Sequence, residues 1–275
     1  MCMKGVEECS RIEFTEKEDS YIPAFNCFAY GAYYADMFRK FTNIDCFLPE
    51  SGTDYEMTNA ITYWIHSRWR HSGRNEAAVA DPIEIIREAR LGKRFRCVEY
   101  CIVLHAAINS CDVKTRVLYL RTHDVETRSS GADHVVVECF LRSFGKWAIF
   151  DPQFNIHAEV DGVSLNAVEL QSALHSCYEN INMFENKSRI NTRKKRKCAS
   201  WLCPYLYYFH TDTEAVYPPK YPRIQILLMP VGAAVPAKFQ GIPLKERLIT
   251  TNSYRSFYPF QSDFIWNTQP ALYRL

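Results

Sequence analysis

The stretch RFRCVEYCIVLHAAI, residues 94–108, decides the fold that we expect for this chain. From Val98 onward it is apolar on nearly every side, which is typical of a helix buried inside a domain. Cys97 stands where the preceding loop becomes this helix. In the first turn of a helix, free backbone N–H groups and the positive end of the dipole favour a thiolate over a thiol. Arg94 and Arg96 add positive charge, so we expect a reactive cysteine at this position.

Two segments further along indicate a β-hairpin: HVVVECFL, residues 134–141, and WAIFDPQF, residues 147–154. Their β-branched and aromatic side chains favour strands, and Pro152 closes the second strand just after Asp151. His134 and Asp151 therefore lie toward one end of the hairpin. One register pairs His134 with Asn155 and another pairs it with Asp151, and the sequence does not choose between them.

Cys97 and His134 are candidates for nucleophilic catalysis. A cysteine nucleophile needs a partner that keeps it ionised and later protonates the leaving group, and histidine is the usual choice. His134 is the candidate for this role, and Asp151 lies toward the same end of the predicted hairpin.

The order of these elements resembles the transglutaminase-like superfamily, a branch of the papain-type fold. The resemblance covers roughly residues 55–155 and is carried by GKRFRCVE (92–99), DHVVVE (133–138) and WAIFDP (147–152). It implies that Cys97 is the nucleophile, His134 the general base and acid, and Asp151 the group that orients the imidazole. Members of the superfamily also use a tryptophan to hold the oxyanion, and the resemblance offers Trp64 or Trp69 for this role.

We expect an α+β fold in which a papain-like transglutaminase core packs its nucleophile helix on an antiparallel sheet. Residues 1–52 are expected to form an N-terminal lead-in and packing segment, and residues 53–160 the core. Residues 161–275 are expected to add a mixed C-terminal extension of helix and strands that packs on the core. Helices are predicted from Asp54, capped by Thr53 or Asp54 itself, and from Pro82, capped by Asp81.

Composition argues against several classes of function. The 275 residues carry a net charge of +2, which gives no electrostatic reason to expect nucleic acid or a membrane as a partner. The basic run at 187–197 is a single cluster without interleaved aromatic residues, so we interpret it as a solvated connector. Eleven cysteines show no paired spacing, which favours a reducing compartment and a cytoplasmic location.

A metal site on the helix is a weaker interpretation. Cys97, Cys101 and His105 share one helix face, but a straight helix seldom offers three ligands to one ion, and no CxxC pair supplies the others. We therefore expect neither a metal nor a cofactor.

The predicted function is cysteine-dependent acyl transfer or amide hydrolysis through a thioester on Cys97: transamidation, deamidation or proteolysis. The expected substrates are a peptide, a protein glutamine or an acyl thioester, with water or an amine as acceptor. An arylamine N-acetyltransferase-like enzyme is one alternative, although the glycines typical before its cysteine are missing. A protein that only binds on the same fold is the other.

Overall fold

The computed structural model describes residues 9–259 except 24, 28–29, 215–216, 219–223 and 245–246. Helices and short 3₁₀ turns occupy much of its first half and return near its end. They are α1 (Ala32–Thr42), η1 (Ile44–Phe47), α2 (Asp54–His66), α3 (Pro82–Arg90), α4 (Cys97–Asn109), α5 (Ala167–Ser176), η2 (Tyr178–Asn180), α6 (Thr192–Leu202), η3 (Cys203–Tyr205) and α7 (Tyr254–Phe257).

Most strands belong to one large sheet with the order β12-β9-β8-β1-β2-β3-β4-β6-β7 and with β5 paired to β4. The pairs are antiparallel except for β9 and β12, which run parallel. The strands are β1 (Thr115–Arg121), β2 (Asp133–Leu141), β3 (Lys146–Asp151), β4 (Ile156–Val160), β5 (Val163–Ser164), β6 (Ile181–Glu185), β7 (Ser188–Arg189), β8 (Tyr208–Asp212), β9 (Ile224–Leu228) and β12 (Arg247–Thr251). A separate small hairpin joins β10 (Lys238–Phe239) to β11 (Ile242–Pro243).

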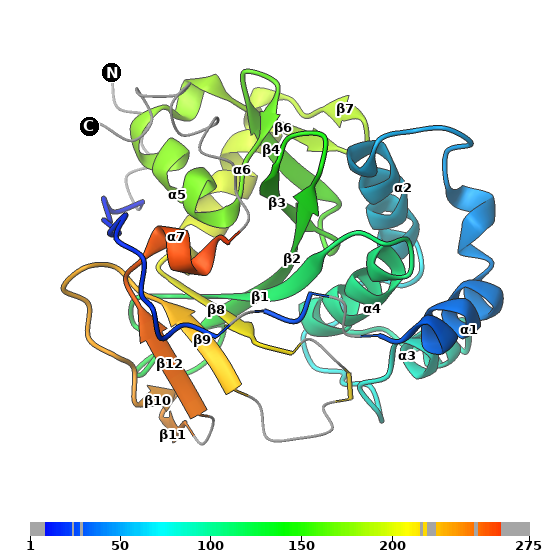
Figure 1. Ribbon diagram of the computed structural model, residues 1–275, viewed down its shortest axis with the longest axis horizontal. Helices are drawn as coiled ribbons and strands as arrows, with labels where there is room; N and C mark the ends of the chain where they lie inside the picture. The colour runs from blue at the N-terminus through cyan, green and yellow to red at the C-terminus, as the bar shows by residue number, and fades with distance from the viewer. Residues whose placement is uncertain are drawn as a thin grey trace.

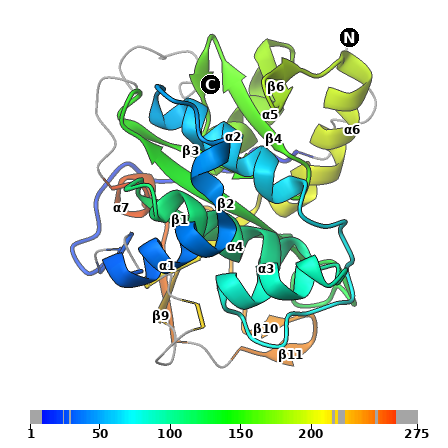
Figure 2. The ribbon, with the colours of Figure 1, turned by 90° about the vertical axis from the view of Figure 1, so that its right-hand side faces the viewer.

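Helices cover both faces of this sheet (Figures 1 and 2). On one face, α2 and α4 pack against β2, and α1 and α3 pack against α4; the core that they share includes Val135 and Val137. On the other, α5, α6 and α7 pack around Val136 and Ile149. The alternation of neighbouring β2 residues between two cores follows from the strand period of two. The chain is thus an α+β protein whose helix starting at Cys97 packs on an antiparallel sheet, which confirms the predicted fold class.

The three predicted segments share this layered structure. Strand β8, from the C-terminal segment, pairs with β1 of the predicted core. Thr15, near the N-terminus, forms a bridge with Ser253 near the end of the described chain. The division at residues 52 and 160 therefore remains a proposal.

Local capping explains where the helices near the site begin. Thr53 caps α2 through a capping box with Glu56, which decides between the two predicted caps. The Asp81 carboxylate accepts hydrogen bonds from the backbone N–H groups of Ile83 and Glu84 at the start of α3, as predicted.

The register of the β2–β3 hairpin differs from both predicted registers. Leu141 pairs with Lys146 and Val137 with Phe150. Extending this register puts Asp151 opposite Val136, one step beyond the last recorded pair. Asp151 thus lies diagonally across from His134, and residues two apart along a strand share a face. The turn between β2 and β3 contains four residues, a length that neither of the two predicted registers assumed.

The C-terminal segment contains two helices, α6 and α7, that the sequence did not indicate. Residues 163–184 include a helix, α5, and most of strand β6, and the second half of the basic run, from residue 192, begins helix α6 instead of forming a solvated connector. Asn191 caps α6 by accepting a hydrogen bond from the Lys194 backbone. Lys195 is buried and its ammonium group donates to the Tyr178 carbonyl at 2.7 Å, so part of the run is needed for packing.

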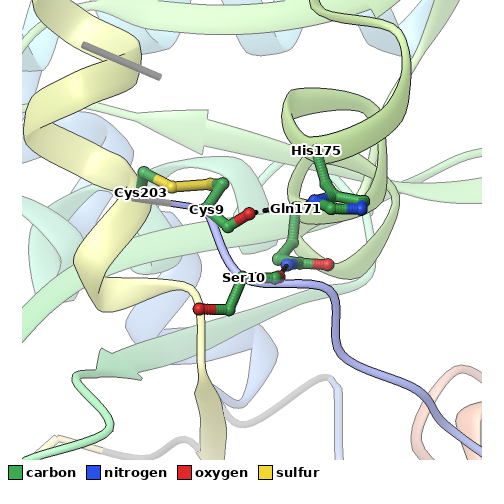
Figure 3. Close-up of a disulfide and its surroundings, with 5 residues drawn as sticks. All are labelled: Cys9, Ser10, Gln171, His175 and Cys203. Atoms are coloured by element: carbon green, nitrogen blue, oxygen red, sulfur yellow. Dashed lines mark hydrogen bonds between the residues drawn. A yellow bond between two sulfur atoms is a disulfide. The ribbon is translucent and has the colours of Figure 1, made fainter. Parts of the chain in front are cut away.

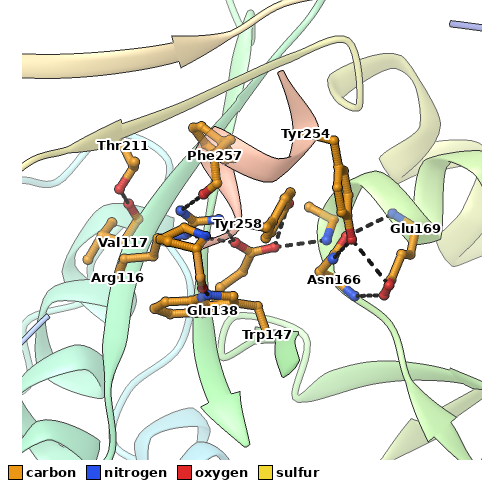
Figure 4. Close-up of polar contacts among 12 residues, drawn as sticks. Arg116, Val117, Glu138, Trp147, Asn166, Glu169, Thr211, Tyr254, Phe257 and Tyr258 are labelled. Atoms are coloured by element: carbon orange, nitrogen blue, oxygen red, sulfur yellow. Dashed lines mark hydrogen bonds and ion pairs between the residues drawn. The ribbon is translucent and has the colours of Figure 1, made fainter. Parts of the chain in front are cut away.

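A buried ion pair fastens α5 and α7 to the sheet (Figure 4). The Arg116 guanidinium binds the Glu138 carboxylate at 2.7 Å, and both side chains are almost completely buried. Arg116 also donates to the Phe257 carbonyl at 2.6 Å. Glu138 accepts hydrogen bonds from Tyr258 and from the Ala167 backbone at 3.0 and 2.9 Å. Charges buried this deeply require such complete pairing.

A disulfide joins Cys9 to Cys203 and so ties the N-terminal segment to η3 (Figure 3). Two side chains of α5 hold the same segment: Gln171 donates to the Ser10 carbonyl and His175 lies 3.0 Å from the Cys9 carbonyl. No spacing of the cysteines in the sequence indicates this pairing. Disulfides persist mainly in oxidising compartments, so this bond weighs against the cytoplasmic location, which remains a prediction. No helix in the described ranges has both the length and the apolar character needed to cross a bilayer.

Candidate active site

The three predicted site residues come from three neighbouring elements. Cys97 is the first residue of α4, His134 the second residue of β2, and Asp151 the last residue of β3. The recorded β2–β3 pairs end at Val137 and Phe150, so His134 lies past the paired part of the hairpin. This end of the sheet therefore leaves His134 open to contact from other elements.

His134 and Asp151 are hydrogen bonded. Nε2 of His134 lies 2.7 Å from Oδ2 of Asp151. The other carboxylate oxygen, Oδ1, accepts hydrogen bonds from the backbone N–H groups of Gln153 and Phe154 at 2.9 and 3.1 Å. Asp151 is thus held by the turn that follows β3, and it fixes the orientation of the imidazole.

The electrostatics of His134 favour the imidazolium. Burial opposes the charged form, since only 2% of the residue is exposed. The Asp151 carboxylate, together with the nearby Cys97 sulfur, outweighs burial and raises the pKa of His134 to about 10. Because Asp151 occupies Nε2, the nitrogen left for other contacts is Nδ1.

Cys97 differs from the next cysteine of its helix. Cys97 is partly exposed, whereas Cys101 is buried and donates from its sulfur to the Val135 carbonyl. Burial, and secondarily the charges of Cys97 and Asp151, raises the pKa of Cys101 well above the ordinary thiol value. Cys97 therefore has the accessibility that a nucleophile needs, while Cys101 is part of the core.

The positive charge expected beside Cys97 is partly neutralised. Arg96 forms ion pairs with Glu99, at 3.1 Å, and with Glu76. The Glu99 carboxylate also accepts a hydrogen bond from the Arg96 backbone N–H at the start of α4. Arg96 therefore mainly stabilises the start of α4. Its charge is paired with carboxylates, whereas the sequence suggested an unpaired cation beside Cys97.

Three aromatic side chains pack around the imidazole of His134. The Trp201 ring meets the His134 ring edge to face, with 4.8 Å between centroids, and Phe154 and Tyr205 lie 5.9 and 6.0 Å away. Trp201 comes from the end of α6 and Tyr205 from η3. The strand-like composition of residues 201–210 did not indicate either residue as part of the site. No local pattern signals this contact, because it depends on how α6 packs on the sheet.

His71 is a second histidine near the site, in the loop that joins α2 to α3. It forms a bridge with Phe95, and the neighbouring Ser72 N–H donates to the Phe95 carbonyl at 2.8 Å. Burial and the nearby positive charge of His134 lower the pKa of His71, while Asp151 acts in the opposite direction. His71 is exposed, so it lies at the rim of the site.

The two tryptophans considered for the oxyanion lie in different surroundings. Trp64 packs against Phe47 and Arg68. Trp69 contacts Phe95 and Tyr100, which flank Cys97 in sequence. Nε1 of each indole is buried and makes no hydrogen bond in the described part of the chain. An oxyanion role for Trp69 remains a prediction.

Two of the three residues considered for a metal, Cys101 and His105, belong to the core. Cys101 is hydrogen bonded as described above, and His105 is buried with its Nδ1 at 2.6 Å from the Thr115 hydroxyl. Across the residues that the structure covers, no group of three His, Cys, Asp or Glu side chains has the arrangement of a metal site.

In this structure a helix begins at a cysteine and packs on an antiparallel sheet that carries histidine and aspartate on adjacent strands. Residues 48–152 match the profile of the Transglutaminase-like superfamily. The match confirms the resemblance for this segment of the chain. The segment contains Cys97, His134 and Asp151.

Two solved structures are similar in part. A candidate cysteine protease from Cytophaga hutchinsonii shares 15% identity with a TM-score of 0.37, over 64% of this chain and 55% of that chain. A candidate protease from Parabacteroides distasonis shares 15% identity with a TM-score of 0.33, over 60% and 28%. The alignments thus span about half or less of those chains, and we draw no conclusion about activity from them. No curated protein matches the chain significantly.

Proposed function

We propose that the chain catalyses acyl transfer or amide hydrolysis through a thioester on Cys97, with His134 and Asp151 completing a catalytic triad. The observation that carries this proposal is the 2.7 Å contact between His134 and Asp151, next to a partly exposed cysteine at a helix start. The superfamily match supports a cysteine-dependent hydrolase or acyltransferase in general terms.

In the proposed first step, the Cys97 thiolate attacks a carbonyl carbon and forms a C–S bond. The carbonyl oxygen becomes an oxyanion, which the free backbone N–H groups at the start of α4 stabilise. The C–N bond of the substrate then breaks, and the His134 imidazolium gives its Nδ1 proton to the leaving amine. The product is a thioester on Cys97 and a neutral imidazole.

In the second step, water or an amine attacks the thioester and gives a proton to His134. The C–S bond breaks, and the thiolate–imidazolium pair is restored. Asp151 keeps the imidazole in one orientation through both steps, because its other oxygen is fixed by two backbone N–H groups. Hydrolysis, deamidation or transamidation follows according to which acceptor enters.

The substrate class of this proposal is a peptide, a protein glutamine or an acyl thioester. The test measures ammonia release from glutamine peptides, with and without a primary amine, and acetyl transfer from acetyl-CoA to arylamines. The variants are Cys97→Ala and His134→Gln, and Cys46→Ala replaces an exposed cysteine of η1 as the matched control.

We expect turnover by the wild-type chain and by Cys46→Ala, with losses of about 10³-fold or more for Cys97→Ala and about 10²- to 10⁴-fold for His134→Gln. Acetyl transfer to arylamines without any glutamine reaction would favour the acetyltransferase alternative. Equal turnover by Cys97→Ala and the wild-type chain would contradict the proposal.

A further inference from the structure

A large cavity lies between the sheet and α6, on the side of the sheet away from α4. Its volume is about 760 Å³, within the range of sites for small organic ligands. The cavity floor is formed by apolar side chains of the sheet and α5: Val136, Ile149, Ile156, Ala158, Leu170 and Met183. Helix α6 forms the opposite wall. A hydrocarbon chain in this space would be removed from water on most of its surface.

The cavity borders the candidate active site but is separate from it. Asp151, Phe154 and Trp201 line the cavity, and all three contact His134. Neither Cys97 nor His134 lines it. A ligand here would therefore contact the residues that support His134, outside the space where the Cys97 sulfur reacts.

The charges around the cavity are mostly positive. Arg193, Lys194 and Lys197 of α6 line it. Lys194 forms an ion pair with Glu185 at 2.6 Å, whereas Arg193 and Lys197 are exposed and form no ion pair within the part of the chain that the structure describes. The first turn of α6 contains no acidic residue, so the positive end of its dipole adds to the potential.

Acidic side chains do not offset this charge. Among the lining residues that the structure describes, Asp151 is the single carboxylate. Its two oxygens are already engaged by His134 and by two backbone N–H groups. An apolar floor beneath two unpaired cations suits a ligand with a hydrocarbon body and an anionic head.

We propose that this cavity binds a monocarboxylate with a hydrocarbon chain, a ligand of the fatty-acid class. Its tail lies on the sheet floor, and its carboxylate is bound by Arg193 and Lys197. This assignment also gives the basic run a role: Arg193, Lys194 and Lys197 face the cavity, Lys195 is buried, and Arg196 faces solvent. The proposal does not rest on the activity of Cys97.

The test is isothermal titration of the full chain with decanoate, and with decanol and decyltrimethylammonium as neutral and cationic probes of equal chain length. We expect decanoate to bind with one-to-one stoichiometry and at least about tenfold more tightly than either of the other probes. The double variant Arg193→Glu/Lys197→Glu should weaken decanoate binding at least about tenfold. The control Lys187→Glu/Arg196→Glu makes the same change in charge at exposed positions outside the cavity and should leave the affinity unchanged.

Alkylation of individual cysteines gives an independent readout. Cys198 lines the cavity, whereas Cys46 is exposed on η1. Saturating decanoate should slow labelling of Cys198 by iodoacetamide at least about fivefold without slowing that of Cys46. Absence of decanoate binding, equal binding of all three probes, or unprotected Cys198 would overturn the proposal. Because Cys97 is not measured, these outcomes are independent of whether it is catalytic.

Discussion

Replacing Asp151 by asparagine removes the charge opposite His134 while nearly preserving the size of the side chain. In the wild-type chain the pKa of His134 is raised from 6.5 to about 10 against the effect of burial. At about 1.4 kcal/mol for each tenfold change, this corresponds to about 5 kcal/mol in favour of the imidazolium. Without the carboxylate, burial becomes the main influence and the pKa of His134 falls. In the proposed mechanism the imidazolium stabilises the Cys97 thiolate, so this substitution should remove that stabilisation.

The rate of alkylation by iodoacetamide at pH 6 measures this effect without a substrate. A cysteine of ordinary acidity is only about 0.3% thiolate at that pH. An ion pair that keeps Cys97 ionised therefore predicts labelling about 10- to 100-fold faster than at exposed Cys46, after allowing for the lower nucleophilicity of a stabilised thiolate. Asp151→Asn should reduce the Cys97 rate toward that of Cys46.

The matched control is Asp161→Asn, the same change at an exposed turn, which should leave Cys97 labelling unchanged. Circular dichroism would verify that both variants fold. If Asp151→Asn folds and labels Cys97 as fast as the wild-type chain, the reasoning about the imidazolium is wrong.

Three further predictions follow from the same geometry. Cys9→Ser removes a cross-link that spans 194 residues to Cys203 and should lower the free energy of unfolding by about 2–5 kcal/mol in urea, whereas an unchanged midpoint would contradict the bond. Glu138→Gln leaves the buried charge of Arg116 without its counter-ion and should lower the free energy of unfolding by about 3–5 kcal/mol in the same measurement. A decrease of less than about 0.5 kcal/mol would refute the role of Glu138 as the counter-ion of Arg116. Because the pKa of His134 is raised, the contribution of its charged form to stability is complete below pH 6.5 and is lost as the pH rises through about 10. The difference in unfolding free energy between the wild-type chain and His134→Gln should therefore shrink only as the pH rises through this range.

The sequence was sufficient to predict the core because local signals there agree with each other. Thr53 and Asp81 cap helices through short-range hydrogen bonds, and the apolar run after Cys97 forms a buried helix as expected. His134 and Asp151 were expected at one end of a hairpin, and they are hydrogen bonded there. The register itself was not predictable, since the turn length depends on which side chains each face buries.

Features that depend on contacts between residues far apart in the chain could not be predicted from the sequence. The pairing of Cys9 with Cys203 joins residues 194 positions apart, and no spacing rule indicates it. Trp201 reaches His134 only because the basic run folds as a helix and packs on the sheet. Lysines and arginines in succession suggested a solvated segment, but the helical period distributes them between a buried position and the cavity.

The central claim is that Cys97 forms a covalent acyl intermediate with the help of His134. The most direct test is brief reaction with p-nitrophenyl acetate, an acid quench, and peptide mapping by mass spectrometry. We predict one acetyl group on Cys97 that hydroxylamine removes, and at least about 10²-fold slower acetylation in His134→Gln. Acetylation spread over exposed cysteines such as Cys46, or equally fast acetylation of Cys97 in His134→Gln, would contradict the claim.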